Sequence, residues 1–539
     1  MRKKRWVFIC VGILVYVLLL FILCVSESKY RKVLIENKKA QTEAYREGDR
    51  EEELLDSDSV IDTPFEAIWY SVTTLTTVGY GDLYPRSPVG KLIGLIFMLF
   101  SLGLLAYLIT IFLARARTRF FPRIMLYFLR RKYWYLFDGY TAESAVIARN
   151  LKKEYPECVV LFFGTEDSKA GEVPEGSRVV FSAEELLRFR KKGQEATIFY
   201  ISKNQAENYS QAIELRAEDC KVCCMTEYEP QMLPNHVTLF NPFQCCARLY
   251  WKEHPVISPK EKIVFIGDGK YCRALLEQAL MINVFAPGQQ VSYTVFGSAG
   301  NFRETHPLFA RAMETKGEED FLGDSLVFSE QSCQEELDIL GTATRIILCE
   351  DDEELALDHL CELRRFCAVT GEIHIRTSVS FPGVLTFGNV QEIFTPELVL
   401  RQKLNRAAIA LHNIYREEYP AIPAWENLDN FKQYSNFAAA DHLDVKARIL
   451  LGEDAKDLAG FERYRKAYAA YLASREENGE VYRQIEHARW LRVYLLYNWR
   501  YAPVRDDSRR LHPLMRPYGQ LPEEERVKND GPWEILEFL

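Results

Sequence analysis

Two long apolar runs without a charged residue constrain the fold of this chain more than any other feature. Residues 6–25 form the first run and residues 92–113 the second, so their lengths are 20 and 22 residues. A helix of that length spans ~30 Å, the thickness of the hydrocarbon core of a bilayer. A signal peptide is the alternative for the first run, but the run is too long and no small-residue cleavage site follows it. We therefore expect two membrane-spanning helices.

Basic residues flank the outer ends of this pair of runs. Residues 2–5 are all Lys or Arg, and four arginines lie between positions 115 and 123. Because loops rich in Lys and Arg stay in the cytoplasm, we expect a multi-pass protein of the cell (inner) membrane with both termini cytoplasmic. Segment 43–62 would then face outward; its nine acidic and two basic residues form either a solvated loop or a collar that concentrates cations.

A glycine-containing motif lies between the two runs. Residues 77–82 read Thr-Val-Gly-Tyr-Gly-Asp, and Thr63 and Pro64 upstream suit the start of a short helix. Glycine accepts backbone angles that turn successive carbonyl groups toward one axis, and rings of carbonyl oxygens can replace the water shell of a potassium ion. A chance Gly-Tyr-Gly in a membrane loop is the alternative, but the upstream Ser-Val-Thr-Thr and the flanking runs agree with a pore.

Segment 64–82 resembles the pore helix and selectivity filter of potassium channels, which implies K⁺ as the permeant ion. The resemblance assigns the filter to Thr77, Val78, Gly79, Tyr80, Gly81 and Asp82. It also implies a tetramer, because one chain supplies one filter segment, and a hydrogen bond from Trp69 to Asp82 behind the filter. Thr73 stands where some family members carry a glutamate. Gly103 is either the hinge of the inner gate or a small residue that permits tight helix packing.

Strand and helix patterns alternate after Arg131. Apolar strands are predicted at residues 133–137, 158–163, 197–201, 263–266, 291–296, 325–328, 345–348 and 372–375. This alternation predicts two doubly wound parallel α/β lobes. Two such lobes behind a two-span pore resemble the tandem regulator-of-potassium-conductance (TrkA-N-like, Rossmann-like) arrangement. We therefore expect a pore domain at residues 1–120 and lobes at 131–255 and 260–410, which would form a gating ring.

Neither lobe carries a complete dinucleotide fingerprint, which needs three glycines in the first strand-to-helix turn. The second lobe offers Gly267 and Gly269 as a possible nucleotide turn, and the first lobe offers Gly139 alone. The second strands end at Phe163 and Phe296 without the acidic residue that would bind a ribose. NAD binding is thus an open alternative for the second lobe and is not expected in the first.

Five of the 13 cysteines cluster between positions 220 and 246. Cys220 and Cys223 have the spacing of zinc ligands, but the segment continues as an apolar strand-like Val-Cys-Cys-Met. Disulfides are not expected in the cytoplasm. We expect buried thiols that pack as small apolar groups, with no metal site apart from K⁺ in the filter.

The C-terminal part combines helical patterns with a set of spaced motifs. Residues 485–490 read Ile-Glu-His-Ala-Arg-Trp, residues 511–518 read Leu-His-Pro-Leu-Met-Arg-Pro-Tyr, and residues 521–525 read Leu-Pro-Glu-Glu-Glu. This segment resembles the repeat domain named after ryanodine receptors (RyR), with Ala502 where that pattern has glycine. We expect a small, mainly helical RyR-type domain at residues 481–539 and a helical connector at residues 411–480.

This RyR-type segment is rich in aromatic and basic residues, which suit a small nucleotide-type ligand because rings stack on bases and guanidinium groups bind phosphate. The candidate ligand-binding residues are Trp490, Trp499, Tyr501, Arg505, Asp506, Arg509, His512 and Tyr518. In the competing interpretation both tryptophans belong to the domain's own core, and only the Arg505–Arg510 loop faces a ligand.

These observations predict a homotetrameric, potassium-selective channel that is not an enzyme and is gated by a cytoplasmic nucleotide or nucleotide-derived messenger. The architecture is typical of prokaryotic proteins. The net charge of −9 argues against nucleic acid polymers as partners. A non-conducting membrane scaffold and an NAD-dependent oxidoreductase remain the alternatives, although no catalytic constellation is recognisable.

Overall fold

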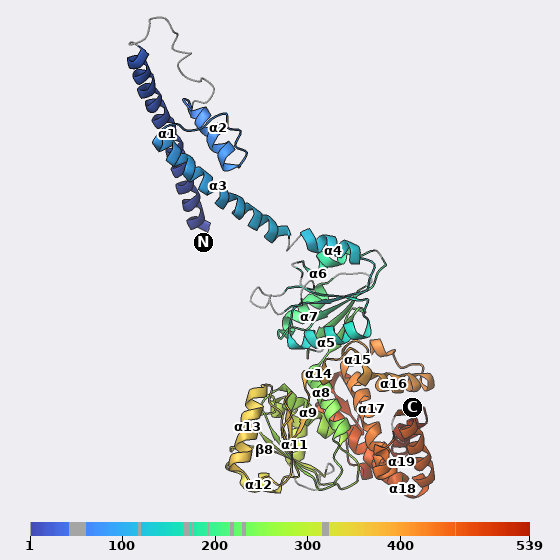
Figure 1. The fold of residues 1–539 in the computed structure, drawn as a ribbon. Helices are drawn as coiled ribbons and strands as arrows, with labels where there is room; N and C mark the ends of the chain where they lie inside the picture. Colours follow the sequence, from blue (N-terminus) through green and yellow to red (C-terminus); the bar gives the residue numbers. More distant parts are fainter. Residues whose placement is uncertain are drawn as a thin grey trace. The chain divides into compact units, whose positions relative to one another are not determined.

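A computed structural model describes residues 2–42, 61–116, 120–164, 181–191, 193–215, 220–228, 233–314, 323–458 and 460–538, with a few single residues between 173 and 179 (Figure 1). The acidic segment proposed as a collar lies outside the described residues, apart from Ile61 and Asp62. The chain divides into two compact units, Met1–Leu126 and Tyr127–Leu539.

The N-terminal unit contains α1 (Arg2–Thr42), α2 (Pro64–Leu75), α3 (Pro88–Arg115) and the first part of α4 (Phe121–Leu129). Gly12–Asn37 within α1 and Pro88–Ala114 within α3 are long and apolar enough to cross a membrane. The two predicted apolar runs thus lie in helices. The short α2 begins with a capping box in which the Thr63 hydroxyl accepts a hydrogen bond from the Glu66 amide, and Pro64 occupies its first turn.

The first sheet of the C-terminal unit contains five parallel strands in the order β2-β1-β3-β4-β5. Their bounds are β1 (Trp134–Phe137), β2 (Val159–Phe162), β3 (Ala196–Tyr200), β4 (Cys220–Met225) and β5 (Val237–Phe240). The helices between them along the chain are α5 (Ala142–Glu154), α6 (Ala183–Phe189) and α7 (Gln205–Glu214), and α8 (Pro242–Glu253) follows β5. Every residue of β1 and β3 is buried, as expected for strands covered on both faces.

The second sheet contains six parallel strands in the order β11-β10-β9-β6-β7-β8. Their bounds are β6 (Lys262–Ile266), β7 (Ser292–Phe296), β8 (Ser325–Ser329), β9 (Arg345–Leu348), β10 (Glu372–Arg376) and β11 (Leu385–Phe387). The associated helices are α9 (Lys270–Ile282), α10 (Phe302–Thr305), α11 (Pro307–Glu314), α12 (Leu337–Thr342), α13 (Glu353–Phe366), α14 (Val390–Ile393) and α15 (Pro396–Val399). The predicted organisation as parallel α/β sheets is confirmed, whereas the domain boundaries stay predictions.

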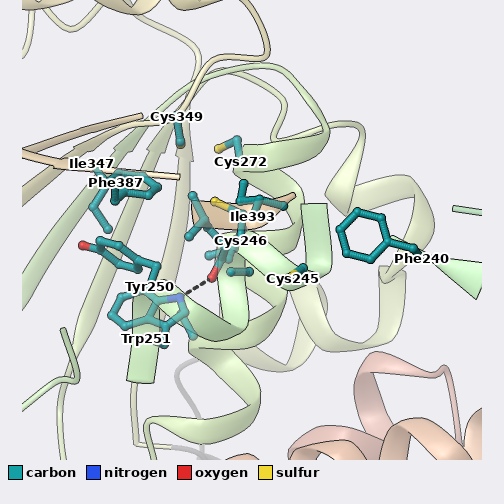
Figure 2. Packing of buried hydrophobic residues seen from close by; sticks show 14 of the residues in the cluster. Phe240, Cys245, Cys246, Tyr250, Trp251, Cys272, Ile347, Cys349, Phe387 and Ile393 are labelled. Atoms are coloured by element: carbon teal, nitrogen blue, oxygen red, sulfur yellow. Dashed lines mark hydrogen bonds between the residues drawn. The ribbon is translucent and has the colours of Figure 1, made fainter. Parts of the chain in front are cut away.

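The clustered cysteines are part of the apolar core. Cys245 and Cys246 of α8 lie with Tyr250 and Trp251 against the second sheet, where the Trp251 indole donates a hydrogen bond of 2.8 Å to the Leu275 carbonyl (Figure 2). Burial raises the pKa of the Cys223 thiol to about 12. Among the described residues no group of three or more His, Cys, Asp or Glu side chains is arranged to hold a metal ion.

The C-terminal helices are α16 (Arg406–Glu418), α17 (Asn430–Leu451), α18 (Gly460–Leu496), α19 (Glu523–Val527) and α20 (Gly531–Glu534), with two short strands, β12 (Arg500–Tyr501) and β13 (Leu511–His512). These helices pack on one another and, through α17 and α18, on α8, α9 and α11. Arg492 of α18 forms a buried ion pair of 2.8 Å with Asp324 beside β8. Arg248 of α8 donates to Asp441 of α17 at 2.7 Å. These buried pairs attach α17 and α18 to the two-sheet body.

Candidate functional site

The first candidate site is the segment that follows α2. The Trp69 indole N–H donates a hydrogen bond of 2.9 Å to an Asp82 carboxylate oxygen, and the Trp69 and Tyr80 rings stack with centroids 6.0 Å apart and planes 5° apart. The hydrogen bond that the family resemblance implies is thus present. Together these contacts fix both ends of the segment 80–82 against α2.

The backbone of this segment alternates in conformation. Thr77, Gly79 and Gly81 have positive φ angles of 60°, 54° and 75°. The amides of Val78 and Gly79 both donate to the Thr73 carbonyl, at 2.9 and 3.1 Å. A residue with a side chain pays ~1–2 kcal/mol for a left-handed conformation, so glycine is the favoured residue at positions 79 and 81. Alternating left-handed residues allow successive carbonyls to face one side, as a cation-coordinating filter requires.

Thr73 and Gly103 are two further positions of this unit that the sequence singled out. Thr73 is buried, and its hydroxyl donates a hydrogen bond of 3.1 Å to the Tyr70 carbonyl within α2. Gly103 lies inside the unbroken helix α3, and a Cβ there would meet no other atom of this chain within 4 Å. Packing within one chain therefore does not require a glycine at position 103, and its role as a hinge stays a prediction.

A buried carboxylate connects α1 to the start of α3. It was not among the residues predicted from the sequence. The Glu27 carboxylate accepts hydrogen bonds from the amides of Arg86 and Ser87 at 3.0 and 2.9 Å and from the Ser87 hydroxyl at 2.7 Å. Its side chain is 5% exposed, and a Cβ at Gly90 would lie 2.1 Å from its oxygen. A carboxylate at a helix N-terminus satisfies free amides and interacts favourably with the helix dipole.

We expect Glu27→Ala to destabilise the N-terminal unit by about 2 kcal/mol, because it removes a cap and leaves two amides without their acceptor. Thermal unfolding of the purified protein in detergent measures the effect. Glu36→Ala is the matched control, since Glu36 lies exposed on the same helix. Equal transition temperatures for the two variants would contradict this role of Glu27.

The predicted nucleotide turn of the second lobe is surrounded by carboxylates. A Cβ at Gly269 would lie 2.3 Å from the Asp351 carboxylate, which itself accepts a hydrogen bond of 3.0 Å from the Tyr271 amide at the start of α9. Glu350 accepts from the Asp268 amide at 3.2 Å. These groups take up the donors that a pyrophosphate would use, and they would repel it. The possible nucleotide turn at Gly267 and Gly269 stays a prediction, with these carboxylates opposing a phosphate there.

The second candidate site is a cavity of about 420 Å³ lined by α16, α17, α18 and residues of the segment 505–535. Pockets of this size bind small molecules. The aromatic rings of Trp490 and Tyr494, 4.1 Å apart, contribute to its wall. The lining holds four basic side chains (Lys446, Arg489, Arg505 and Lys528) against two carboxylates (Glu486 and Glu525). This excess of cations favours an anionic occupant.

The inner end of the cavity is a buried cluster of three charges. Lys446 Nζ lies 2.8 Å from one Glu486 oxygen, and Arg489 donates to the other oxygen at 2.5 Å. All three residues are at most 3% exposed. Burial lowers the pKa of the Lys446 ammonium to about 8. Burial raises the pKa of Glu486, but Arg489 and Lys446 outweigh it and hold that pKa below its usual range.

Two polar atoms of this cluster, Arg489 Nη1 and Glu486 Oε2, make no hydrogen bond among the described residues. Arg489 Nη1 is buried and donates no hydrogen bond there. A buried guanidinium nitrogen without an acceptor is costly, so an anion that entered the cavity would find a donor already in place. At the other side of the cavity His512 has its pKa lowered to about 4 by burial and by Arg505, so it is neutral at pH 7.

Three of the eight predicted ligand-binding residues, Trp490, Arg505 and His512, line this cavity. The other five lie elsewhere. Trp499 is buried in a core cluster, and Asp506 caps the turn at 507–509. Tyr501 is exposed and accepts a hydrogen bond from Arg516, and Tyr518 donates one to Glu480. Arg509 is exposed. The competing assignment of Trp499 to the core therefore agrees with its position.

The buried charges were not among the predicted site residues. Glu486 and Arg489 belong to the motif at 485–490, and Lys446 falls in the expected connector. The sequence carried little signal for Lys446, because Asp444 and Arg448 lie two positions away on either side and the stretch is typical of a charged helix face. A charged residue at a core position requires a buried partner.

The N-terminal segment is similar to known ion channels. Residues 53–118 match a family model described as an ion channel. A voltage-gated potassium channel of Aeropyrum pernix is 48% identical over 54 residues, which are 10% of this chain and 18% of that protein. Potassium channel KAT1 of Oryza sativa subsp. japonica is 54% identical over 43 residues, 8% of this chain and 6% of that protein. The chain thus spans less than a fifth of the length of these curated relatives.

Two solved structures also match. The crystal structure of GsuK bound to ADP is 16% identical, with 75% of this chain and all of that chain covered at a TM-score of 0.32. The crystal structure of a mutant of GsuK is 15% identical, covers the same share and has a TM-score of 0.31. Likeness at these scores carries no argument about function.

Proposed function

We propose that the chain forms, as a homotetramer in the cell membrane with both termini cytoplasmic, a potassium-selective channel that responds to a nucleotide-type ligand. The observation that carries the proposal is the segment 77–82, where left-handed residues alternate and Trp69 bonds to Asp82. The match of residues 53–118 to the ion channel family supports the same assignment. Potassium would pass between carbonyl rings contributed by four chains.

The cavity lined by α16, α17 and α18 supports the ligand-sensing part of the proposal. The rings of Trp490 and Tyr494 offer a stacking surface for a base, and Arg489 and Arg505 offer donors for phosphate. The resemblance to an RyR-type domain covers this same region. An occupant would bias the spacing of α17 and α18, and the ion pairs Arg492–Asp324 and Arg248–Asp441 would carry that bias to the two sheets.

Arg505→Ala tests the site without disturbing the buried core, because its side chain is 52% exposed and pairs only with Asp507 among the described ion pairs. We expect the concentration of nucleotide that gives a half-maximal change in potassium flux to rise roughly tenfold, because the variant loses one charge-assisted hydrogen bond to the ligand. The measurement is flux from liposomes across a panel of nucleotides. Arg509→Ala is the control, since Arg509 is exposed on the same loop outside the cavity. Identical responses of the two variants would remove the cavity from the proposal.

A further inference from the structure

The helix α4 (Phe121–Leu129) carries an exposed apolar face. Phe121, Ile124 and Phe128 are 58%, 42% and 76% exposed, and Tyr127 beside them is 56% exposed. Positions 121, 124 and 128 are spaced to lie on one side of a helix. Soluble surfaces rarely gather large apolar side chains in this way, so this face has a partner that covers it.

The opposite side of α4 is held in place. Leu126 is fully buried. The Leu129 carbonyl accepts a hydrogen bond of 3.0 Å from the indole of Trp134, the first residue of β1. The Arg130 carbonyl accepts another, of 3.3 Å, from the Lys191 amide. The C-terminal end of α4 is therefore attached to the first sheet.

Positive charge surrounds the helix. Residues 115–132 contain seven Lys or Arg and no Asp or Glu, although the whole chain has a net charge of −9. The Arg130 guanidinium lies 4.1 Å from the centroid of the Tyr127 ring, at the border of the apolar face. A short helix with an apolar face and basic flanks is typical of segments that lie in the membrane–water interface.

The length of the chain limits where this face can be. The candidate span in α3 ends at Ala114, and residues 115–120 separate it from the start of α4. Six residues reach at most ~20 Å when fully extended. If α3 crosses the membrane, α4 begins within that distance of the bilayer surface. The same face of a second copy would carry the same cations, whereas an anionic lipid surface has the opposite charge.

We propose that α4 lies in the cytoplasmic membrane interface, with Phe121, Ile124 and Phe128 at the acyl boundary and Arg130 and Arg131 bound to the headgroups of anionic phospholipids. The inference rests on the proposed membrane topology and not on conduction or on the nucleotide site. It makes the lipid surface a direct contact of the segment that joins α3 to the first sheet. Anionic lipid would thereby favour one position of that segment.

Amide hydrogen exchange of the full-length protein tests the proposal in three settings: detergent, phosphatidylcholine nanodiscs, and nanodiscs of equal parts phosphatidylcholine and phosphatidylglycerol. We expect the amides of 121–129 to exchange at least tenfold more slowly in the anionic discs than in either other setting. The basis is that each basic residue near an anionic surface contributes roughly fivefold to binding. Arg130→Gln combined with Arg131→Gln should remove most of this difference, as should Phe121→Ser combined with Phe128→Ser.

Phe366→Ser is the matched control, since Phe366 is 59% exposed on α13. It should leave the exchange of α4 unchanged. Equal exchange of α4 in the two kinds of disc would overturn the proposal. Equal protection in detergent and in anionic discs would also overturn it, because a neighbouring chain would then cover the face. Potassium flux, measured separately with Tyr80→Ala as a blank, shows whether the proposed function itself has failed.

Discussion

Gly79→Ala is expected to abolish potassium-selective flux, with a loss of at least a hundredfold. Gly79 has a φ of 54°, and an alanine there would pay ~1–2 kcal/mol in every chain of a tetramer. The chain would relax toward a negative φ and turn one ring of carbonyl groups away from the axis. Since a dehydrated cation needs each ring, the barrier to permeation would rise steeply. Flux of potassium from liposomes is the measurement.

The control for this variant is Gly12→Ala. Gly12 lies in the helix α1, and a Cβ there would meet no atom within 4 Å. The Gly12→Ala protein should conduct potassium as the unmodified protein does. A second comparison is Tyr80→Phe, which retains the ring that stacks on Trp69 and should retain selectivity. Normal flux through the Gly79→Ala protein would contradict the assignment of residues 77–82 as the filter.

Glu486→Ala is expected to destabilise the C-terminal region by about 3–5 kcal/mol. It would leave the ammonium of Lys446 and the guanidinium of Arg489 buried without the carboxylate that both contact. Breaking a buried ion pair by removing one partner costs this much because the remaining charge has lost its solvation. Burial lowers the pKa of Lys446 to about 8, and Glu486 opposes this lowering. Without Glu486 that pKa would fall further, so Lys446 would lose its proton. Denaturant unfolding followed by tryptophan fluorescence measures the change, with Trp490, Trp499 and Trp533 in this region.

Glu476→Ala is the comparison for this effect, since Glu476 is exposed on the same helix. Exposed substitutions change stability by less than about 0.5 kcal/mol. If the two variants unfolded at the same denaturant concentration, the cluster of Lys446, Glu486 and Arg489 would not hold α17 and α18 together.

The pore segment was predictable because its signals are local. Each signal determines the backbone conformation at its own position: the capping residues Thr63 and Pro64, the glycines at 79 and 81, and the apolar runs on either side. Glu27 was not predictable, since its partners at Arg86 and Ser87 are 59 and 60 positions away along the chain.

The two sheets were predicted from alternating apolar strands, and the strands that were missed show the limit of that signal. β5 and β11 contain four and three residues, and both lie at the edges of their sheets. β5 has only two fully buried residues, and β11 has one. A strand so short and so partly buried has no periodicity to read.

The cavity could be predicted only in part. Trp490, Arg505 and His512 stand out by residue type, but the cavity exists because α17 brings Lys446 to Glu486, 40 positions further along the chain. Trp499 and Tyr501 looked equally suitable in sequence. Packing keeps both out of the cavity, because Trp499 is buried against Phe431 and Tyr494, and Tyr501 pairs with Arg516.

The most direct test of the account is the flux of potassium and sodium from liposomes that contain the purified full-length protein, with and without a panel of nucleotides. The account predicts flux that is strongly selective for potassium and that changes in the presence of at least one nucleotide. Equal flux of the two ions, or no flux under any condition from a protein with an intact tetramer, would contradict it.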